Sequence, residues 1–94
     1  MPAWAYMLRC ADDSYYVGCT TDLDGRLGHH IAGTHGGYTA ARRPVQLVWA
    51  DEFQTIHDAI DAERRIKGWS RAKKEALIRG DGDAIQRLAS RAKR

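Results

Sequence analysis

The sequence predicts an α+β fold in which a small, mostly antiparallel sheet of three strands is flanked by helices. Two apolar and aromatic segments on either side of a turn predict a hairpin, a third segment alternates with a period of two, and later segments repeat apolar residues at helical spacing. The chain has 94 residues, which suffices for one domain with a single modest core. The expected order of elements is β-β-α-β-α-α, and a last basic helix can follow.

Three segments are expected to form the strands. Each is rich in apolar, β-branched or aromatic residues, and in the third Val45, Leu47 and Trp49 alternate as a half-buried strand requires. Asp12 and Asp13, between the first two segments, favour a tight turn. The predicted strands are residues 3–10, 15–20 and 45–50.

Four segments are expected to form helices. In the first, Thr21 is the expected N-cap and Gly33 the expected end, while Leu23, Leu27 and Ile31 form the expected buried row. An exposed, glycine-containing loop should follow it. The predicted helices are residues 21–32, 55–69, 71–79 (after Ser70 and before Gly80) and about 83–91, and the predicted loop is residues 34–43.

Charge is divided unevenly along the chain. Residues 1–63 carry four Arg and nine Asp or Glu, whereas residues 64–94 carry eleven Lys or Arg and three acidic residues. A basic C-terminal third fits a nucleic-acid backbone. Taken alone, however, the charge is better explained as the solvated surface of helices, and it does not select a chemistry.

The compartment is inferred from what the chain contains. No stretch approaches the about 20 apolar residues needed to span a bilayer, and the first ten residues do not resemble a signal peptide. Cys10 and Cys19 flank the predicted hairpin and should lie either on opposite faces or roughly 13 Å apart along the strands. Neither arrangement permits a disulfide. We therefore expect reduced thiols and a soluble, cytoplasmic protein with no membrane partner.

Glu63 lies within the apolar stripe of its predicted helix. The apolar positions of that stripe are Ile56, Ala59, Ile60 and Ile66. A carboxylate directed toward a core costs several kcal/mol unless it is paired or binds a metal. The ordinary explanation is an ion pair with Lys67, one turn later, and helix geometry alone favours it. The alternative is a functional site.

Arg26 and His30 lie one turn apart on the first predicted helix and should project in the same direction from the rim of the core. Arginine presents a planar fork suited to phosphate, and histidine exchanges a proton near neutral pH. Considered singly, each is better explained by an ordinary role: an arginine lying along the surface, and a capped or solvated histidine.

The predicted hairpin carries two tyrosines, Tyr6 and Tyr16. If the turn is odd in length, both project from one face of the sheet. Gly18 then lies on that face and leaves a gap in which a ligand can approach the backbone. Tyrosine in strands usually serves packing, and the hydrophobic pattern does not decide the register.

Together these residues resemble the motifs of the GIY-YIG nuclease family. The ordered set is Tyr6 in AYML, Tyr16-Val17-Gly18, Arg26, His30 and Glu63, supported by RRPVQLVW and AERRIKGWSRAKK. The resemblance extends from about Ala3 to about Ile78, and the short chain is similar to the small bacterial single-domain subgroup. Two departures are present: Ala5 and Met7 replace Gly and Ile of the tripeptide that names the family, and Gly37 stands where many relatives have Lys before the Tyr38-Thr39 pair.

The resemblance implies a divalent-metal-dependent endonuclease that hydrolyses DNA, is structure-directed, and acts in repair or recombination. Glu63 would hold one Mg²⁺ or Mn²⁺, and Arg26 would stabilise charge on the phosphoryl group. Tyr6 would activate the attacking water with His30 assisting, or His30 would take the proton itself, and Tyr16 would position water or phosphate. The residues expected to contact DNA are Tyr38, Arg42, Arg43, Arg64, Lys67, Lys73 and Lys74.

We expect residues 1–80 to form the GIY-YIG-like nuclease domain and residues 81–94 to add a basic helical tail to the same unit. Branched, nicked or single-stranded DNA are the candidate substrates, because no separate recognition domain is expected. The alternative is a non-catalytic nucleic-acid-binding module with the same fold, and a weaker one is a protein-interaction domain. The sequence lacks an HExxH motif, the cysteines of a zinc finger and a phosphate-binding glycine loop.

Overall fold

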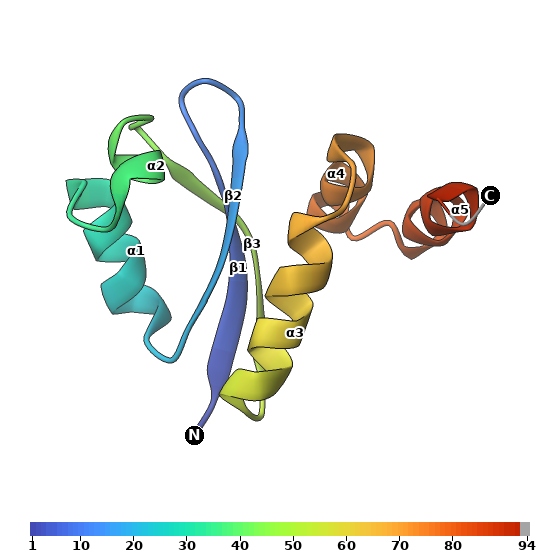
Figure 1. Ribbon diagram of the computed structural model, residues 1–94, viewed down its shortest axis with the longest axis horizontal. Helices are drawn as coiled ribbons and strands as arrows, with labels where there is room; N and C mark the ends of the chain where they lie inside the picture. Colours follow the sequence, from blue (N-terminus) through green and yellow to red (C-terminus); the bar gives the residue numbers. More distant parts are fainter. Residues whose placement is uncertain (93–94) are drawn as a thin grey trace.

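A three-stranded sheet enclosed between helices forms the body of the protein (Figure 1). The computed structural model describes the backbone of residues 1–92 and the side chains of residues 1–88. The elements are β1 (Ala3–Arg9), β2 (Tyr15–Thr20), α1 (Leu23–Ala32), α2 (Gly37–Ala40), β3 (Gln46–Phe53), α3 (Ile56–Lys67), α4 (Arg71–Arg79) and α5 (Gly82–Ala92). The strand order is β2-β1-β3 with antiparallel pairing throughout. The predicted α+β class, antiparallel sheet and element order are confirmed.

The helices cover both faces of the sheet. Helix α1 lies on one side and α3 on the other, while α4 and α5 continue beyond α3 (Figure 1). On the α3 side, Ala5, Met7 and Val17 of the sheet pack with Ala62 and Ile66 of α3 to form the core. Ala5 and Met7, the two departures from the family tripeptide, are therefore packing residues on the face opposite the neighbouring tyrosine.

The hairpin register places both tyrosines on one face. Tyr6 pairs with Gly18, and Leu8 pairs with Tyr16, so side chains at these positions project together. The turn contains Asp13 with a φ of 66°, a left-handed conformation that Asp tolerates better than most residues. The shared face expected for an odd-length turn is confirmed.

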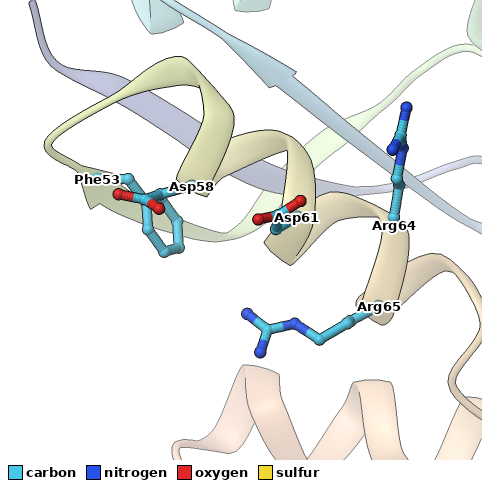
Figure 2. A pocket seen from close by; sticks show the side chains of 5 residues that line it. All are labelled: Phe53, Asp58, Asp61, Arg64 and Arg65. Carbon is cyan, nitrogen blue, oxygen red and sulfur yellow. The ribbon is translucent and has the colours of Figure 1, made fainter.

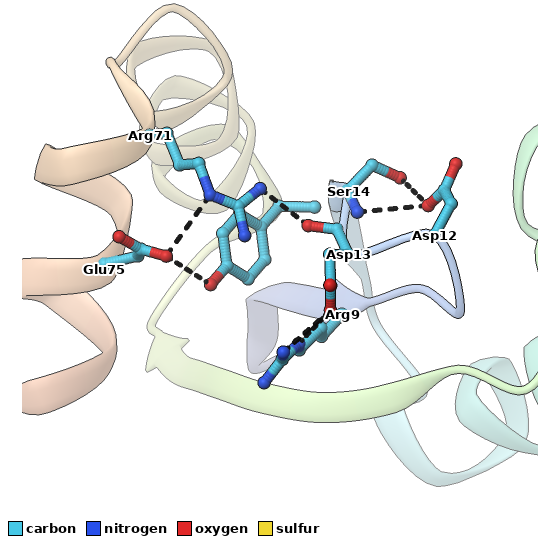
Figure 3. Close-up of polar contacts among 7 residues, drawn as sticks. Arg9, Asp12, Asp13, Ser14, Arg71 and Glu75 are labelled. Carbon is cyan, nitrogen blue, oxygen red and sulfur yellow. Dashed lines mark hydrogen bonds and ion pairs between the residues drawn. The ribbon is translucent and has the colours of Figure 1, made fainter.

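Polar contacts hold the hairpin turn against α4 (Figure 3) and against the segment before β3. Arg71 of α4 donates from Nη1 to the backbone oxygen of Asp13 at 2.6 Å, and Tyr15 Oη donates to Glu75 at 3.1 Å. The backbone N–H of Ala11 donates to the carbonyl of Arg42 at 2.9 Å. These contacts fix the end of the hairpin and thereby the start of β2.

The third strand differs from its predicted form. It runs from Gln46 to Phe53, later and longer than the expected 45–50 segment. Met7 pairs with Trp49 while Leu8 pairs with Leu47, so Val48 is an extra residue in a β-bulge. The simple alternation expected of this strand is therefore wrong, because the bulge lets both Val48 and Trp49 pack against the α3-side core.

Two predictions for α1 are also wrong. The N-cap is Asp22 rather than Thr21, because the Asp22 carboxylate accepts a hydrogen bond from the Gly25 N–H at 3.1 Å. Ile31 was expected to be buried with Leu23 and Leu27, but it is 59% exposed. His30 is the buried residue of this helix, since its ring has hydrogen-bond partners that make burial of a polar group tolerable.

The segment after α1 is not a wholly exposed loop. It contains the short helix α2, in which Thr39 is 1% exposed. The predicted start of α4 is confirmed, since Ser70 accepts a hydrogen bond from the Lys73 N–H. Thr55 caps α3 in the same way, but α3 ends at Lys67 rather than at residue 69. Gly80 ends α4 in a left-handed conformation with a φ of 71°. Helix α5 packs on α4 and covers the predicted 83–91 segment.

Both cysteines are free thiols, as expected. Cys19 pairs with Ala5 in the hairpin, whereas the Cys10 N–H donates to Ser14 beyond the end of the strand. Over residues 1–92, every helix is too short or too polar to cross a membrane.

Candidate functional site

A buried chain of hydrogen bonds links β1, α1 and α2. The Tyr6 hydroxyl lies 2.8 Å from His30 Nε2, and His30 Nδ1 lies 2.8 Å from Thr39 Oγ1. Thr39 Oγ1 in turn donates to the backbone carbonyl of His35 at 3.2 Å. Tyr6, His30 and Thr39 are each at most 1% exposed. Three side chains remote in sequence are therefore joined in a solvent-excluded polar chain.

Burial shifts the pKa values of Tyr6 and His30 in the directions that keep both side chains neutral. It raises the pKa of Tyr6 to about 12, and the nearby Arg26 guanidinium offsets only part of that rise. Burial also lowers the pKa of His30 to about 4, with further contributions from His35 and Arg26. At neutral pH the pair is thus a phenol and a neutral imidazole, which is a proton donor facing a proton acceptor.

Tyr16 and Arg26 border this pair. The Tyr16 ring centroid lies 6.4 Å from that of Tyr6 and 5.3 Å from that of His30. Arg26 Nη1 donates to the Cys19 carbonyl at 3.5 Å. Both side chains are half-buried. A guanidinium and a phenol with partial access to solvent are therefore next to the buried pair.

Gly18 has a different role from the one expected. A Cβ atom built there would lie 2.6 Å from the Tyr6 hydroxyl oxygen, which is closer than non-bonded atoms approach. The phenol of Tyr6 itself fills the space beside this glycine. The expectation of an open gap for a ligand is wrong, and the absence of a side chain at Gly18 makes room for Tyr6.

Glu63 approaches from α3, on the other face of the sheet. Its Oε1 atom lies 2.8 Å from Lys67 Nζ, and its side chain is 16% exposed. The Cys19 thiol is 3.9 Å from Oε2. The ion pair anticipated as the ordinary explanation for this carboxylate is present. The hydrogen bond with Glu63 raises the pKa of Lys67, and the Tyr16 phenol raises it further.

Arg26 and Glu63 approach the edge strand β2 from opposite faces of the sheet. Arg26 contacts the Cys19 carbonyl from the α1 side, while Glu63 lies beside the Cys19 thiol from the α3 side. Tyr6 and Tyr16 lie on the α1 face of the sheet, whereas Glu63 lies on the α3 face, so the acid is not brought into contact with the phenols.

Glu63 is the residue that fits a divalent metal ion. Among the described residues there is no cluster of three or more His, Cys, Asp or Glu that would form a cage. Mg²⁺ does not require one, since it commonly binds one or two carboxylates and keeps several water ligands. The Glu63 carboxylate is paired with Lys67 in this structure, so a hydrated hard cation would bind there only in exchange for that ammonium.

Several residues expected to contact DNA have partners within the protein. Arg42 stacks on the Tyr38 ring at 3.9 Å and pairs with Asp12 at 3.1 Å. Arg43 donates to the carbonyls of Ala32 and Ala40. These arginines thus hold the loop around α2 in place.

The expected cations of α3 and α4 are also partly engaged. Lys67 pairs with Glu63, and Lys73 lies 4.0 Å from the Trp69 ring centroid. Lys74 is half-buried. Arg64 lines an open groove together with Phe53, Asp58, Asp61 and Arg65. Figure 2 shows Arg64 and Arg65 leaving α3 in different directions. This groove has acids as well as arginines and includes no member of the Tyr6–His30–Thr39 chain.

Two neighbours of the site were not expected from the sequence. Thr39 contacts His30, and the Cys19 thiol contacts Glu63. A threonine in a glycine-containing loop carries no signal of burial. Cys19 and Tyr16 are three positions apart on β2, so their side chains project from opposite faces of the sheet. This spacing could have shown that the thiol lies on the α3 side.

Comparison with known proteins identifies the class that this fold and site define. Residues 2–76 match the profile of the GIY-YIG catalytic domain, and the chain belongs to the GIY-YIG family. Members of this family are typically metal-using endonucleases, so the chain has a nuclease-type domain.

Within the family, the chain is similar to small proteins described as UPF0213. It is 47% identical to one from Bacillus pumilus over 78% of this chain and 74% of that protein. A protein of the same description from Natronomonas pharaonis is 43% identical over 80% and 88%. The solution structure of one from Bacillus halodurans has a TM-score of 0.57 and 39% identity, covering 87% of each chain.

Proposed function

We propose that this protein is a divalent-metal-dependent endonuclease that hydrolyses DNA phosphodiester bonds. The observation that carries the proposal is the buried Tyr6–His30 pair, in which a phenol meets a neutral imidazole at 2.8 Å beside Tyr16 and Arg26.

The pair supports a route for the proton of the attacking water. A phenolate is disfavoured at neutral pH because the pKa of Tyr6 is raised. Tyr6 therefore accepts a proton from water as its own proton passes to His30 Nε2. The water oxygen bonds to phosphorus and the bond to the leaving oxygen breaks. The leaving oxygen takes a proton from solvent, and the His30 imidazolium releases its extra proton to solvent, which restores the neutral pair. Since Tyr6 is 1% exposed, a bordering side chain must move to admit the water.

The remaining site residues bind and orient the phosphate. Arg26 stabilises the negative charge that develops on the phosphoryl oxygens, and Tyr16 positions the phosphate or the water. Mg²⁺ or Mn²⁺ held by Glu63 would supply Lewis-acid stabilisation of the phosphate and the leaving oxygen.

The substrate is proposed to be selected by structure rather than by sequence. Residues 1–80 serve as the nuclease domain and residues 81–94, of which 93–94 lie outside the described residues, as its basic tail, with no segment assigned to reading base edges. Branched, nicked or single-stranded DNA in repair or recombination, within the cytoplasm, fits this arrangement.

The test is incubation of the full chain with single-stranded, nicked, flapped and four-way DNA in Mg²⁺ and in Mn²⁺. Cleavage should be lost in Glu63→Ala and in Arg26→Ala. Glu52→Ala, at an exposed glutamate of β3, is the matched control and should cleave like the unmodified protein. Full activity of either site variant, with the fold intact by circular dichroism, contradicts the proposed site.

A second candidate is a non-catalytic nucleic-acid-binding module. The Glu63–Lys67 ion pair and the burial of the Tyr6 side chain favour it, because both features are ordinary in a domain that only binds nucleic acid. In that case Glu63→Gln leaves DNA affinity unchanged and no substrate is cut with either metal.

A further inference from the structure

Thr39 decides which ring nitrogen of His30 carries the proton. We propose that it is a positioning residue, which holds the imidazole in the Nδ1–H form and keeps the Nε2 lone pair directed at Tyr6. The inference rests on the proposed function for its role in cleavage, whereas the tautomer itself is a property of the folded protein.

The first argument starts from the phenol. The Tyr6 O–H is buried and needs an acceptor. Arg26, which also lies near this hydroxyl, carries donors only. In the part of the chain that the structure describes, His30 Nε2 is the hydrogen-bond partner of this hydroxyl. Nε2 must therefore accept, and the ring proton must lie on Nδ1.

The second argument starts from Thr39, at the other end of the series of hydrogen bonds. The His35 carbonyl can only accept, so the single proton of the Thr39 hydroxyl is directed to it at 3.2 Å. The Thr39 oxygen then presents a lone pair to His30 Nδ1 at 2.8 Å. The hydrogen bonds Tyr6–His30, His30–Thr39 and Thr39–His35 thus each have one donor and one acceptor. Over the described residues, no buried side-chain nitrogen or oxygen lacks a partner.

Removal of the threonine hydroxyl releases this constraint. In Thr39→Val, Nδ1–H loses its acceptor, and the Nε2–H form becomes competitive because it can donate to the Tyr6 oxygen. An imidazole in that form cannot receive the phenol proton. Cleavage therefore requires the tautomer that Thr39 stabilises.

The spectroscopic test uses ¹⁵N NMR of the histidine rings in the full chain at neutral pH. The unmodified protein should show His30 as the Nδ1–H tautomer, and Thr39→Val should show a loss or mixture of that form. Thr39→Ser keeps the hydroxyl and should restore it. The Nε2–H form in the unmodified protein, or an unaltered tautomer in folded Thr39→Val, overturns the inference.

The kinetic test uses a DNA that the unmodified protein cleaves. In Thr39→Val, kcat should fall roughly 10²-fold, the usual scale for general acid–base catalysis, with KM little changed. Thr39→Ser should recover most of the rate, and Thr21→Val, at an exposed threonine, should have no effect. If no DNA is cleaved, the proposed function fails, and the NMR result still decides the tautomer. A folded Thr39→Val variant with an unchanged kcat contradicts the positioning role.

Discussion

Replacement of Gly18 by alanine tests whether Tyr6 is packed as described. The added Cβ would lie 2.6 Å from the Tyr6 oxygen and 2.7 Å from its Cζ, so the ring has to move. Movement disturbs the 2.8 Å bond to His30, a loss of about 0.5–1.5 kcal/mol, and overpacking adds about 1–3 kcal/mol. Loss of glycine flexibility in the unfolded chain returns about 0.5–1 kcal/mol. We expect a net destabilisation of about 0.5–4 kcal/mol.

The assay is the free energy of unfolding in urea, monitored by circular dichroism. Gly28→Ala is the matched control, because a Cβ there meets nothing within 4 Å. That exposed position in α1 should gain up to about 1 kcal/mol from the better helix propensity of alanine. If Gly18→Ala is as stable as the unmodified protein, the close packing of the phenol against β2 is refuted.

Three further predictions concern caps, pH and the ion pair. Asp22→Ala should lower the free energy of unfolding by about 1 kcal/mol, and Thr21→Ala should not; the reverse order in urea would restore Thr21 as the cap. The folded-state pKa of His30, about 4, lies below the ordinary 6.5, so its contribution to stability is present above pH 6.5 and is lost as the pH falls toward 4. His30→Gln should flatten that part of the stability–pH curve, whereas exposed His57→Gln should leave it unchanged, and equal slopes in all three proteins would contradict the burial argument. Lys67→Met should lower the free energy of unfolding by about 1–3 kcal/mol, because the Glu63 side chain is only 16% exposed and loses its ion-pair partner; an unchanged stability would show that solvent satisfies the carboxylate.

The sequence alone determined the local structure wherever the signal is local. Ser70 and Gly80 were identified as the boundaries of α4, because a capping hydroxyl and a left-handed glycine act within one helical turn. The family was indicated by the order along the chain of Tyr6, Tyr16, Arg26, His30 and Glu63. The i, i+4 spacing likewise anticipated the partner of Glu63.

Only the tertiary structure decided which polar groups are buried. His30 takes the place expected of an apolar residue in α1 because Tyr6 and Thr39 satisfy its two nitrogens, and these partners lie 24 and 9 positions away. The bulge at Val48 likewise depends on pairing with β1, which no periodicity within β3 reveals. Burial of a polar side chain depends on partners supplied by other elements, so a pattern within one segment cannot determine it.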